Sequence, residues 1–404
     1  MDADADTDAD IAIVGGGPVG AALALALRDS GLRLTVLEAR AAQGGGARDP
    51  RPIALSHGSR LLLERLGVWT NISAMPINHI HVSQRGGFGR VAMSAADAKV
   101  PHLGYVFDYN ELFSELGGAA QRAGCDYRDG ARVKQLTREG TGATPFARLD
   151  YTRDGAAAAL TARLVVVADG GDIAGLAPPK IVDYAQHALT ARVSTTLPHN
   201  QVAYERFTPD GPLALLPYCD SGDRGDRGNM MALVWTLTPA RAEALQDADD
   251  KTFLDALRVA FGARLGDFTS VTQRACYPLT LRYSTNTDML GVISIGNAAQ
   301  TLHPVAGQGF NLGLRDAWEL AQILRAISPQ ALTNPDTTAT LRRFRASRRV
   351  DRGATIAATH GLVRLFSNDF ISASVARGAG MTLLGCIAPA RNFVARRMIF
   401  GARG

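Results

Sequence analysis

Apolar residues follow two patterns in different parts of the chain. Four short, mainly apolar runs end at glycine or at an acidic residue, and they cover residues 11–14, 32–37, 164–168 and 291–295. Such runs are typical of strands buried within a parallel sheet. Between Val182 and Thr280 the strand-like runs are instead separated by turn residues, which is typical of an antiparallel sheet. The pattern therefore predicts an α/β chain with a separate antiparallel lobe.

The first apolar run leads directly into a glycine motif. Ile11–Val14 is followed by Gly-Gly-Gly-Pro-Val-Gly at positions 15–20, a helical stretch to Arg28 and a second strand that ends at Glu38. In this G-x-G-x-x-G motif the first glycine permits a tight turn, the second lets a pyrophosphate approach the backbone, and the third lets the helix pack on the strand. The acid can accept hydrogen bonds from a ribose. The candidate dinucleotide-binding residues here are Gly15, Gly17, Pro18, Val19, Gly20, Glu38 and Arg40. These residues alone do not distinguish FAD from NAD.

Further signals follow before residue 180. Ser56 is expected to cap a helix that runs to Leu66, residues 77–93 alternate like an antiparallel hairpin, and Asn110 is expected to open a helix over residues 111–123. The strand at 164–168 ends at Asp169-Gly170, the position at which ligands bind in open α/β sheets. Arg51 has two interpretations, a bidentate pyrophosphate contact or a surface arginine in a loop. The candidate cofactor residues in this part are Arg51, Asn110, Asp169 and Gly170.

The middle of the chain has a different character. Four strand-like runs cover residues 187–193, 202–207, 213–218 and 231–237. One amphipathic helix over 240–265 interrupts them, and two further strand-like runs cover 268–281 and 289–295. We interpret this part as a lobe that covers a cofactor. No second strand-linked G-x-G-x-x-G motif is present, so a permanently bound second dinucleotide is not expected.

A second glycine-rich segment follows the last of these strands. Residues 296–313 read GNAAQTLHPVAGQGFNLG, in which residues 306–309 are expected to form a glycine-spaced loop. Apolar residues at helical spacing continue to Leu324. Glycines allow close backbone approach, and the free amides of a helix start attract negative charge. A flavin ring fits this description because its reduced form is negative at the pyrimidine end. The candidate cofactor residues are Gly296, Asn297, Pro304, Ala306, Gly307, Gln308, Gly309 and Asn311.

The C-terminal region is basic and helical. Helices are expected over 341–360, 360–366, 371–388 and 392–400. From Leu341 onward there are twelve Arg against two Asp, a charge of +10, so the preceding residues sum to −5 within the total of +5. One interpretation is contact with an acidic partner or an anionic membrane surface. The alternative is that these arginines are solvated or pair with the body of the protein.

Composition excludes several classes of protein. The chain has 404 residues, of which 46% are hydrophobic, so we expect a globular protein of two or three domains. Its four cysteines contain no C-x-x-C pair, which indicates a reduced, cytoplasmic chain without a disulfide framework or a metal site. The first ten residues carry five Asp and no basic residue, unlike an export signal. No apolar run is long enough to span a bilayer.

The three cofactor signals together resemble the class A flavoprotein monooxygenases, which combine an N-terminal G-x-G-x-x-G, a central Asp-Gly and a C-terminal G-D-A-A-H…P-x-x-G-Q-G-x-N segment. The resemblance covers nearly the whole chain. It is closest to the ubiquinone-biosynthesis hydroxylases, and within them to the 2-octaprenyl-6-methoxyphenol hydroxylase branch, through HVSQRG at 81–86, ERFTPDGPLALLP at 205–217 and the 296–313 segment. Asn297 and Gln300 replace the broad family's Asp and His, as in that branch.

This resemblance implies a Rossmann-like FAD-binding domain of the para-hydroxybenzoate hydroxylase type, with an interleaved antiparallel-sheet substrate domain and C-terminal helices. The implied boundaries are 1–72, 105–180 and 281–340 for the FAD domain, 73–104 and 181–280 for the substrate domain, and 341–404 for the helical region. The implied reaction is hydroxylation of a polyprenylated phenol in ubiquinone biosynthesis. FAD, NAD(P)H as transient reductant and O2 as co-substrate act through a peroxyflavin, so the cofactor carries the chemistry.

The resemblance also indicates candidate side chains for catalysis and for substrate binding. His303 has two interpretations, assistance of phenol deprotonation or a structural bond to backbone, and Gln308 is the other candidate catalytic residue. An apolar channel for the prenyl tail is expected from residues 202–218 and the C-terminal helices. The candidate substrate residues are Tyr204, Arg206, Leu215 and Pro217. Expected partners are the phenol, a ubiquinone-biosynthesis protein complex and the inner face of the cytoplasmic membrane, but not nucleic acid.

Two other functions remain open at this point. An FAD-dependent isoprenoid or quinone reductase would use the same cofactor lobe without inserting oxygen. A flavin-binding, non-catalytic subunit of a quinone-biosynthesis complex would need the lobe for stability alone. Product mass separates hydroxylase from reductase, because hydroxylation adds one oxygen atom.

Overall fold

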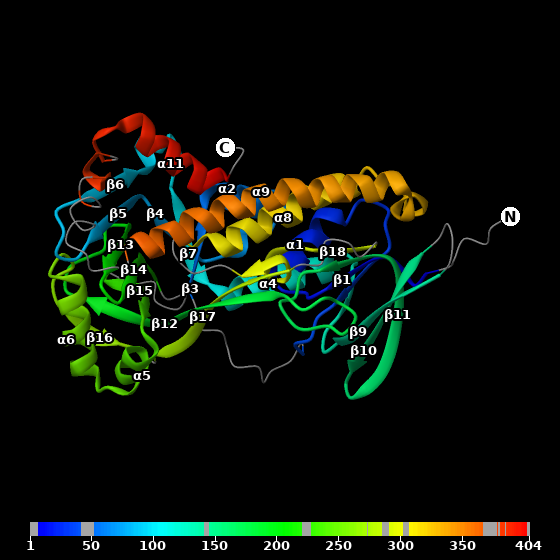
Figure 1. Cartoon of the computed structure of the whole chain (residues 1–404), viewed down its shortest axis with the longest axis horizontal. Helices are drawn as coiled ribbons and strands as arrows, with labels where there is room; N and C mark the ends of the chain where they lie inside the picture. The colour runs from blue at the N-terminus through cyan, green and yellow to red at the C-terminus, as the bar shows by residue number, and fades with distance from the viewer. Residues whose placement is uncertain are drawn as a thin grey trace.

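The computed structural model describes residues 7–41, 52–140, 145–219, 228–272, 274–284, 291–301, 307–366, 378, 380–383 and 385–401. Figure 1 shows two lobes side by side, bridged by a long helix along one surface. Within the described residues the strands form sheets of seven, nine and three strands.

The seven-stranded sheet has a parallel centre and an antiparallel arm. Its order is β8-β2-β1-β11-β10-β9, with β18 also paired to β11. Its strands are β1 (Ala9–Val14), β2 (Leu34–Leu37), β8 (Asp126–Arg128), β9 (Arg132–Glu139), β10 (Phe146–Arg153), β11 (Ala156–Val167) and β18 (Val292–Ser294). The strands predicted from the continuous apolar runs are confirmed. The parallel neighbours of β1 are β2 and β11, so three separated stretches of chain meet beside the first glycine motif.

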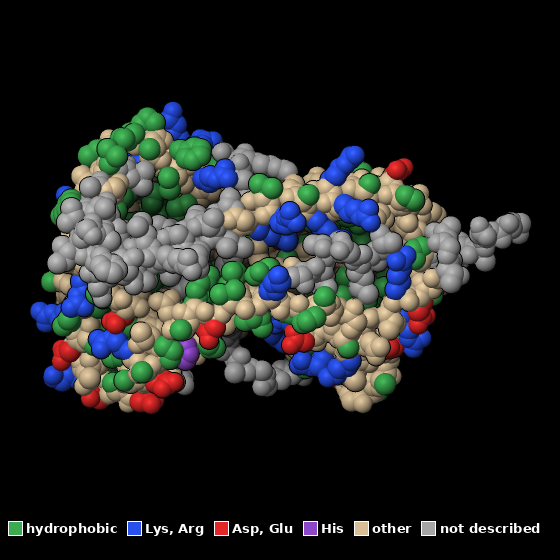
Figure 2. Space-filling model, viewed as in Figure 1, with side chains coloured by type: hydrophobic (Ala, Val, Ile, Leu, Met, Phe, Trp, Pro, Cys, Tyr) green, Lys and Arg blue, Asp and Glu red, His purple; other side chains and the backbone are tan. Residues whose placement is uncertain are grey.

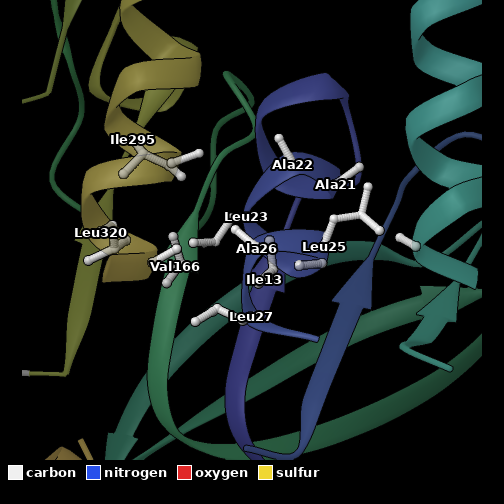
Figure 3. Close-up of a cluster of buried hydrophobic side chains, with 14 of the residues drawn as sticks. Ile13, Ala21, Ala22, Leu23, Leu25, Ala26, Leu27, Val166, Ile295 and Leu320 are labelled. Carbon is white, nitrogen blue, oxygen red and sulfur yellow. The ribbon is translucent and has the colours of Figure 1, made fainter. Parts of the chain in front are cut away.

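Helices cover this sheet through one large apolar core. They are α1 (Pro18–Leu27), α2 (His57–Arg65), α4 (Tyr109–Arg122), α7 (Gly296–Ala299) and α8 (Gln308–Leu324). Figure 3 shows Leu23 and Leu27 of α1 beside Val166 and Ile13 of the sheet, with Leu320 of α8 on the other side of Val166. The predicted cap of α2 is confirmed, because the Ser56 hydroxyl accepts from the Ser59 N–H at 3.3 Å. Helix α4 is capped by Asp108 rather than opened by Asn110.

The nine-stranded sheet forms the second lobe. Its strands are β5 (His79–Gln84), β6 (Arg90–Ser94), β12 (Lys180–Thr195), β13 (Val202–Thr208), β14 (Gly211–Pro217), β15 (Met230–Leu237), β16 (Phe268–Val271), β17 (Ala275–Tyr283) and β19 (Gln300–Thr301). The predicted hairpin is confirmed as the antiparallel pair β5–β6. The order β19-β17-β12-β15-β14-β13-β5-β6, with β16 beside β12, joins distant segments of the chain.

Two sequence expectations for this lobe are wrong in detail. The expected single helix over 240–265 is two helices, α5 (Pro239–Asp247) and α6 (Asp250–Phe261). The break occurs because Asp249 caps α6, accepting from the Thr252 N–H at 2.9 Å. The expected strand over 268–281 is likewise two strands, β16 and β17, which both pair with β12. Helices α5 and α6 cover one face of the sheet through a core that includes Trp235 and Phe253.

A small three-stranded sheet, which the sequence did not indicate, lies between the lobes. It contains β3 (Pro52–Ser56), β7 (Gly104–Asp108) and β4 (Met75–Ile77), with the short helices η1 (Trp69–Asn71) and α3 (Ala95–Ala98) nearby. Its residues Ile77 and Val106 share an apolar cluster with the second lobe. It therefore connects the antiparallel lobe to the first core, to which Leu55 of β3 belongs.

The C-terminal region begins after η3 (Pro329–Thr333). Helix α9 (Pro335–Phe366) is continuous, whereas the sequence predicted a division at His360. Figure 1 shows α9 running over α8 toward β13 and β14, and it contacts both α8 and β14. Helix α11 (Ala388–Phe400) packs on α2 and on α3. Part of the helix expected over 371–388 lies outside the described residues.

Candidate cofactor and substrate site

The first glycine motif forms a tight turn between β1 and α1. Gly15 has φ +97°, its N–H donates to the Leu37 carbonyl at 2.8 Å, and a Cβ at this position would lie 2.7 Å from the Cβ of Asp169. A Cβ on Gly20 would lie 1.9 Å from the carbonyl oxygen of Gly15. Within the described part of the chain, a Cβ on Gly17 would meet only the Tyr109 hydroxyl, at 3.9 Å. Two of these glycines are thus required by packing within the chain, and Gly17 faces open space at the start of α1.

The remaining members of this motif also have defined places. Pro18 stands in the first turn of α1, where its missing N–H costs nothing. Val19 lies against the second glycine segment, since a Cβ on Gly296 would come 3.0 Å from its side chain. The first motif is therefore in contact with the segment that begins at Gly296.

Glu38 is buried at the end of β2 and organises the turn. Its carboxylate accepts from the Gly16 N–H and from the Arg40 N–H, each at 2.8 Å. Burial raises the pKa of this carboxyl, and the two backbone hydrogen bonds act in the opposite direction. A carboxylate offers about four lone-pair positions, so acceptor capacity remains for a ligand hydroxyl.

Aromatic rings surround the same turn. The Arg40 guanidinium lies 4.6 Å from the centre of the Phe113 ring and 5.7 Å from that of Tyr109. The Tyr127 hydroxyl donates to the Gly16 carbonyl at 2.6 Å. These contacts fix Arg40 and Gly16 beside Glu38.

A cavity of about 130 Å³ opens at the carboxyl ends of β1 and β2. It is lined by Val14, Leu37, Ala39, Ala131, Arg132, Val133, Lys134, Asp169, Gly171, Asp172 and Ile173. The start of β9 reaches this place because the Ala131 N–H donates to the Glu38 carbonyl and the Gly130 N–H to the Arg40 carbonyl, each at 2.8 Å. Sequence reasoning missed Arg132 and Lys134, since no local signal shows that the antiparallel arm folds back over these strand ends.

The central Asp-Gly pair lies next to the second glycine segment. The N–H of Asp169 donates to the Val14 carbonyl at 3.0 Å, and its carboxylate accepts from the Gly171 N–H at 3.3 Å. A Cβ on Gly170 would lie 3.7 Å from the Cβ of Asn297. Two predicted residue groups that are more than 120 positions apart in the chain are therefore neighbours.

The second glycine segment differs in one respect from its expected form. Gly307 has φ +58° and is the N-cap of α8, so Gln308 and Gly309 lie in the first helical turn rather than in a loop. The Asn311 side chain ties this turn to β3, because it accepts from the Ser56 N–H at 2.8 Å and donates to the Gly307 carbonyl at 2.7 Å. Asn311 thus holds the helix start in place. Arg51, His303, Pro304 and Ala306 lie outside the described residues.

Buried charge anchors the same segment to the C-terminal helix. The Asp316 carboxylate, fully buried in α8, accepts from the Gly296 N–H at 3.2 Å and pairs with Arg348 at 2.6 Å and Arg352 at 3.0 Å. Arg345 donates to the Val292 carbonyl. These three arginines therefore pair with the body of the protein, which was one of the alternatives that the sequence left open for the basic C-terminal region.

Asn110 and the four candidate substrate residues occupy other places. The Asn110 backbone and amide N–H groups both donate to Asp108, whose other oxygen pairs with Arg192 of β12 at 3.0 Å. Tyr204 and Leu215 pack in the core beneath α5 and α6, and Arg206 donates to the Ala260 carbonyl of α6 at 3.1 Å. Pro217 follows Leu215 by two positions and shares its face. All four therefore point to the face covered by α5 and α6, opposite to the face that carries the Arg192–Asp108 contact.

Comparison with known proteins agrees with this geometry. A family described as an FAD binding domain matches residues 8–349. The ubiquinone hydroxylase UbiL of Rhodospirillum rubrum is 32% identical over 403 residues, covering 97% of this chain and 90% of that protein. The chain belongs to the family of FAD-dependent ubiquinone hydroxylases. The 3-demethoxyubiquinol 3-hydroxylase of Escherichia coli is 32% identical over 329 residues, covering 78% of this chain and 79% of that protein.

A solved structure supports the fold. The p-nitrophenol 4-monooxygenase PnpA of Pseudomonas putida superposes with a TM-score of 0.77 at 18% identity, covering 98% of this chain and 99% of that one. This superposition confirms the predicted α/β fold. The family match and the two relatives above confirm the predicted flavin monooxygenase family, while the narrower branch stays a prediction. No helix among the described residues is long and apolar enough to cross a membrane.

Proposed function

We propose that this flavin monooxygenase hydroxylates the aromatic ring of a polyprenylated phenol in ubiquinone biosynthesis, with NAD(P)H as reductant and O2 as co-substrate. The carrying observation is that Gly17, Glu38 and Asp169-Gly170 lie around the carboxyl end of β1, with Asn297 of the second glycine segment beside Gly170. Its relatives named as ubiquinone hydroxylases support the substrate class.

The residues fit FAD. Gly17 leaves open space before the N–H groups of α1, where a pyrophosphate gains from the helix dipole. Glu38 retains acceptor capacity for a ribose, and the small cavity beside it fits part of the adenosine. At the other end, the first turn of α8 presents N–H groups toward any negative charge at the flavin pyrimidine. Asn297, beside Gly170, would contribute an uncharged contact to the ribityl chain.

When bound, FAD supplies the redox chemistry, which is hydride acceptance from NAD(P)H and transfer of one oxygen atom from O2 to the ring. The chain's own residues then have three tasks: to bind FAD, to hold the phenol, and to exclude water from the reaction. Binding depends on the glycine motifs, and the apolar cluster around Ala203, Phe207 and Tyr218 is suited to the prenyl tail and to exclusion of water.

An absorption spectrum of the purified protein, followed by anaerobic NADPH addition with and without a short prenylated phenol, tests this proposal. We expect a flavin band that bleaches faster with the phenol and, in air, a product heavier by one oxygen atom. NADPH oxidation without oxygen in the product would instead support the reductase, and a bound flavin that no prenylated phenol affects would support the non-catalytic subunit.

The cofactor site has its own test. Gly17→Val should reduce FAD occupancy more than tenfold without lowering the free energy of unfolding of the apoprotein, since its surroundings are open. Gly353→Ala, on an exposed part of α9 where no described atom lies within 4 Å of the added Cβ, is the matched control. A yellow, stoichiometric Gly17→Val protein would refute the placement of the pyrophosphate.

We also propose that an anionic membrane surface is contacted by an apolar patch at the C-terminal region, defined by Phe88, Leu383, Ile387 and Phe393. Their exposed fractions are 66%, 61%, 43% and 65%. Phe88 adjoins the C-terminal segment, since a Cβ on Gly378 would lie 2.8 Å from its ring. Figure 2 shows hydrophobic side chains gathered over α11 with basic ones beside them. Residues 378–401 contain three Arg and no acidic residue, which favours anionic lipid.

Sedimentation with vesicles containing phosphatidylglycerol tests the patch. Leu383→Ser with Phe393→Ser should lower the bound fraction severalfold, and high salt should lower it further. Val259→Ser is the matched control, because Val259 is 66% exposed on α6, which Figure 1 shows well apart from α11. Unaltered sedimentation of the double variant would overturn the membrane contact and leave a protein assembly as the alternative use of the patch.

A further inference from the structure

The two faces of strand β13 carry different chemistry. Tyr204 packs in the core beneath α5 and α6, whereas Ala203 and Phe207 belong to the cluster on the opposite face. Side chains alternate along a strand, so Glu205 shares the face of Ala203 and Phe207. Glu205 is thus the one acidic residue of β13, and it lies on the face away from α5 and α6.

This face is apolar around Glu205. Directly across from it stand Val82 of β5 and Ala214 of β14. The same face extends to Leu216, Tyr218 and Ala232, and to Ile77 and Val106 of the small sheet between the lobes. The adjoining β3 contacts Gly307, because a Cβ there would lie 3.2 Å from the Cβ of Ala54. The face on which Glu205 lies is therefore continuous with the start of α8, where the flavin ring is expected.

The charged side chains that the structure describes on this face are paired with other residues. Arg192 of β12 pairs with Asp108 at 3.0 Å, and Arg391 of α11 pairs with Asp97 at 3.4 Å. Gln84 of β5 is neutral. Helix α9 contacts β14 and carries His360 and Arg364 in its last turns, with side chains outside the described residues. Among the described residues, Glu205 makes no hydrogen bond and no ion pair.

A half-buried carboxyl that has no partner among the residues the structure describes calls for a physical explanation. Burial alone raises the pKa of Glu205 to about 7. A carboxyl in such surroundings is poised to exchange a proton near neutral pH, and groups of this kind concentrate at functional sites.

We propose that Glu205 is the base that accepts the phenolic proton of the substrate. In this step the O–H bond of the phenol breaks, its electron pair stays on the phenolate oxygen, and the proton forms a new O–H bond on the Glu205 carboxylate. The phenolate ring is richer in electrons and reacts more readily with an electrophilic oxygen. The inference rests on the proposed hydroxylation of a phenol.

The first test is steady-state kinetics of the holoenzyme with a short prenylated phenol from pH 5.5 to 9. Glu205→Gln keeps the shape of the side chain and should lower kcat at pH 7 on the order of 100-fold, the usual contribution of a general base. The Kd of the phenol, read from the flavin difference spectrum, should change less than about fivefold. The wild-type rise of rate through pH 7 should disappear in the variant. Glu243→Gln, on the exposed side of α5, is the matched control and should behave as wild type.

A more acidic substrate separates a base from a structural residue. A ring-fluorinated phenol ionises at lower pH and needs less help from a base. The Glu205→Gln enzyme should therefore turn over this phenol at least tenfold faster than it turns over the unfluorinated phenol. A Glu205→Gln enzyme with an unaltered rate and pH profile would overturn the proposal. A loss of rate at every pH that the fluorinated phenol does not reduce would do the same, and would assign Glu205 a packing role.

A readout without turnover keeps this inference separate from the proposed function. The ultraviolet difference spectrum of the bound phenol reports its ionisation in wild-type and Glu205→Gln holoenzyme. If the phenolate signal depends on Glu205 but the wild-type enzyme adds no oxygen to the phenol, Glu205 is still the base and the proposed hydroxylation is refuted. If the enzyme hydroxylates the phenol but both proteins give equal phenolate signals, the proposed function stands and Glu205 is not the base.

Discussion

The two large sheets position their candidate site residues in different ways. In the first lobe, close backbone contacts and hydrogen bonds to the main chain determine each position, as for Gly20 against Gly15 and Glu38 against Gly16. In the second lobe, position depends on which face of a strand a side chain occupies, as for Glu205 and Tyr204. The arrangement in the first lobe can be identified in the sequence as a local motif. The arrangement in the second lobe appears in the sequence only as alternating side chains along a strand, and this pattern does not show which face contacts the ligand.

The largest effect is expected where the first lobe depends on buried charge. Asp316→Ala leaves Arg348 and Arg352 without their buried carboxylate and Gly296 without its acceptor. Removal of one partner of a buried ion pair should lower the free energy of unfolding by about 3–5 kcal/mol. Urea unfolding of the holoprotein measures it. Glu319→Gln, at the half-buried edge of the same network, should cost less, about 1 kcal/mol, because its side chain is partly solvated. Equal losses in the two variants would contradict this account.

A loss of similar or slightly smaller size is expected from apolar packing in the second lobe. Phe253 is fully buried against Trp235, with ring centres 6.4 Å apart. Phe253→Ala should cost about 3–5 kcal/mol by the same unfolding measurement, because it leaves a cavity. The flavin band of the folded variant should keep its full intensity, since this core does not reach the glycine motifs. Loss of flavin at native conditions would show that the two lobes are not separable in this way.

A smaller effect, on the pH dependence of the free energy of unfolding, tests whether Glu205 lies on the buried, apolar face of β13. Burial raises the pKa of Glu205 from 4.5 to about 7, so the native state holds this proton more tightly than the unfolded state does. The free energy of unfolding should therefore fall as pH rises from about 4.5 to 7, by roughly 1–2 kcal/mol after allowance for solvent screening. Glu205→Gln should remove this part of the pH dependence in urea unfolding at pH 5, 6, 7 and 8. Parallel curves for variant and wild type would place Glu205 in contact with water.

The smallest effect concerns the basic helix α9. Arg342 and Arg343 are exposed, unlike the buried Arg348 later in the same helix. Arg342→Glu with Arg343→Glu should change the free energy of unfolding by no more than about 0.5 kcal/mol. Arg348→Ala in the same denaturant series gives the reference. If the double variant lost much more than about 0.5 kcal/mol of the free energy of unfolding, the outer as well as the inner arginines of α9 would form ion pairs with the body of the protein.

Much of the first lobe followed from the sequence because its signals are local. The order strand, glycine turn, helix, strand and acid can be identified within residues 9–38, and the structure has β1, α1, β2 and Glu38 in those places. The start of α8 was assigned less well. Gly309 was expected in a loop, but the Asn311 side chain holds the turn from Gly307 onward in a helix.

The sequence by itself determined the cofactor lobe, since turns, helix starts and buried parallel strands depend on neighbours within a few positions. Only the tertiary structure decided how distant segments meet. It brought Gly170 beside Asn297, folded β9 over the ends of β1 and β2, and drew Asp316 onto two arginines of α9. It also decided that Tyr204 and Arg206 face α6 while Glu205 lies on the other face of the strand. The sequence shows only that side chains alternate, and this alternation is the same whichever face packs against α6.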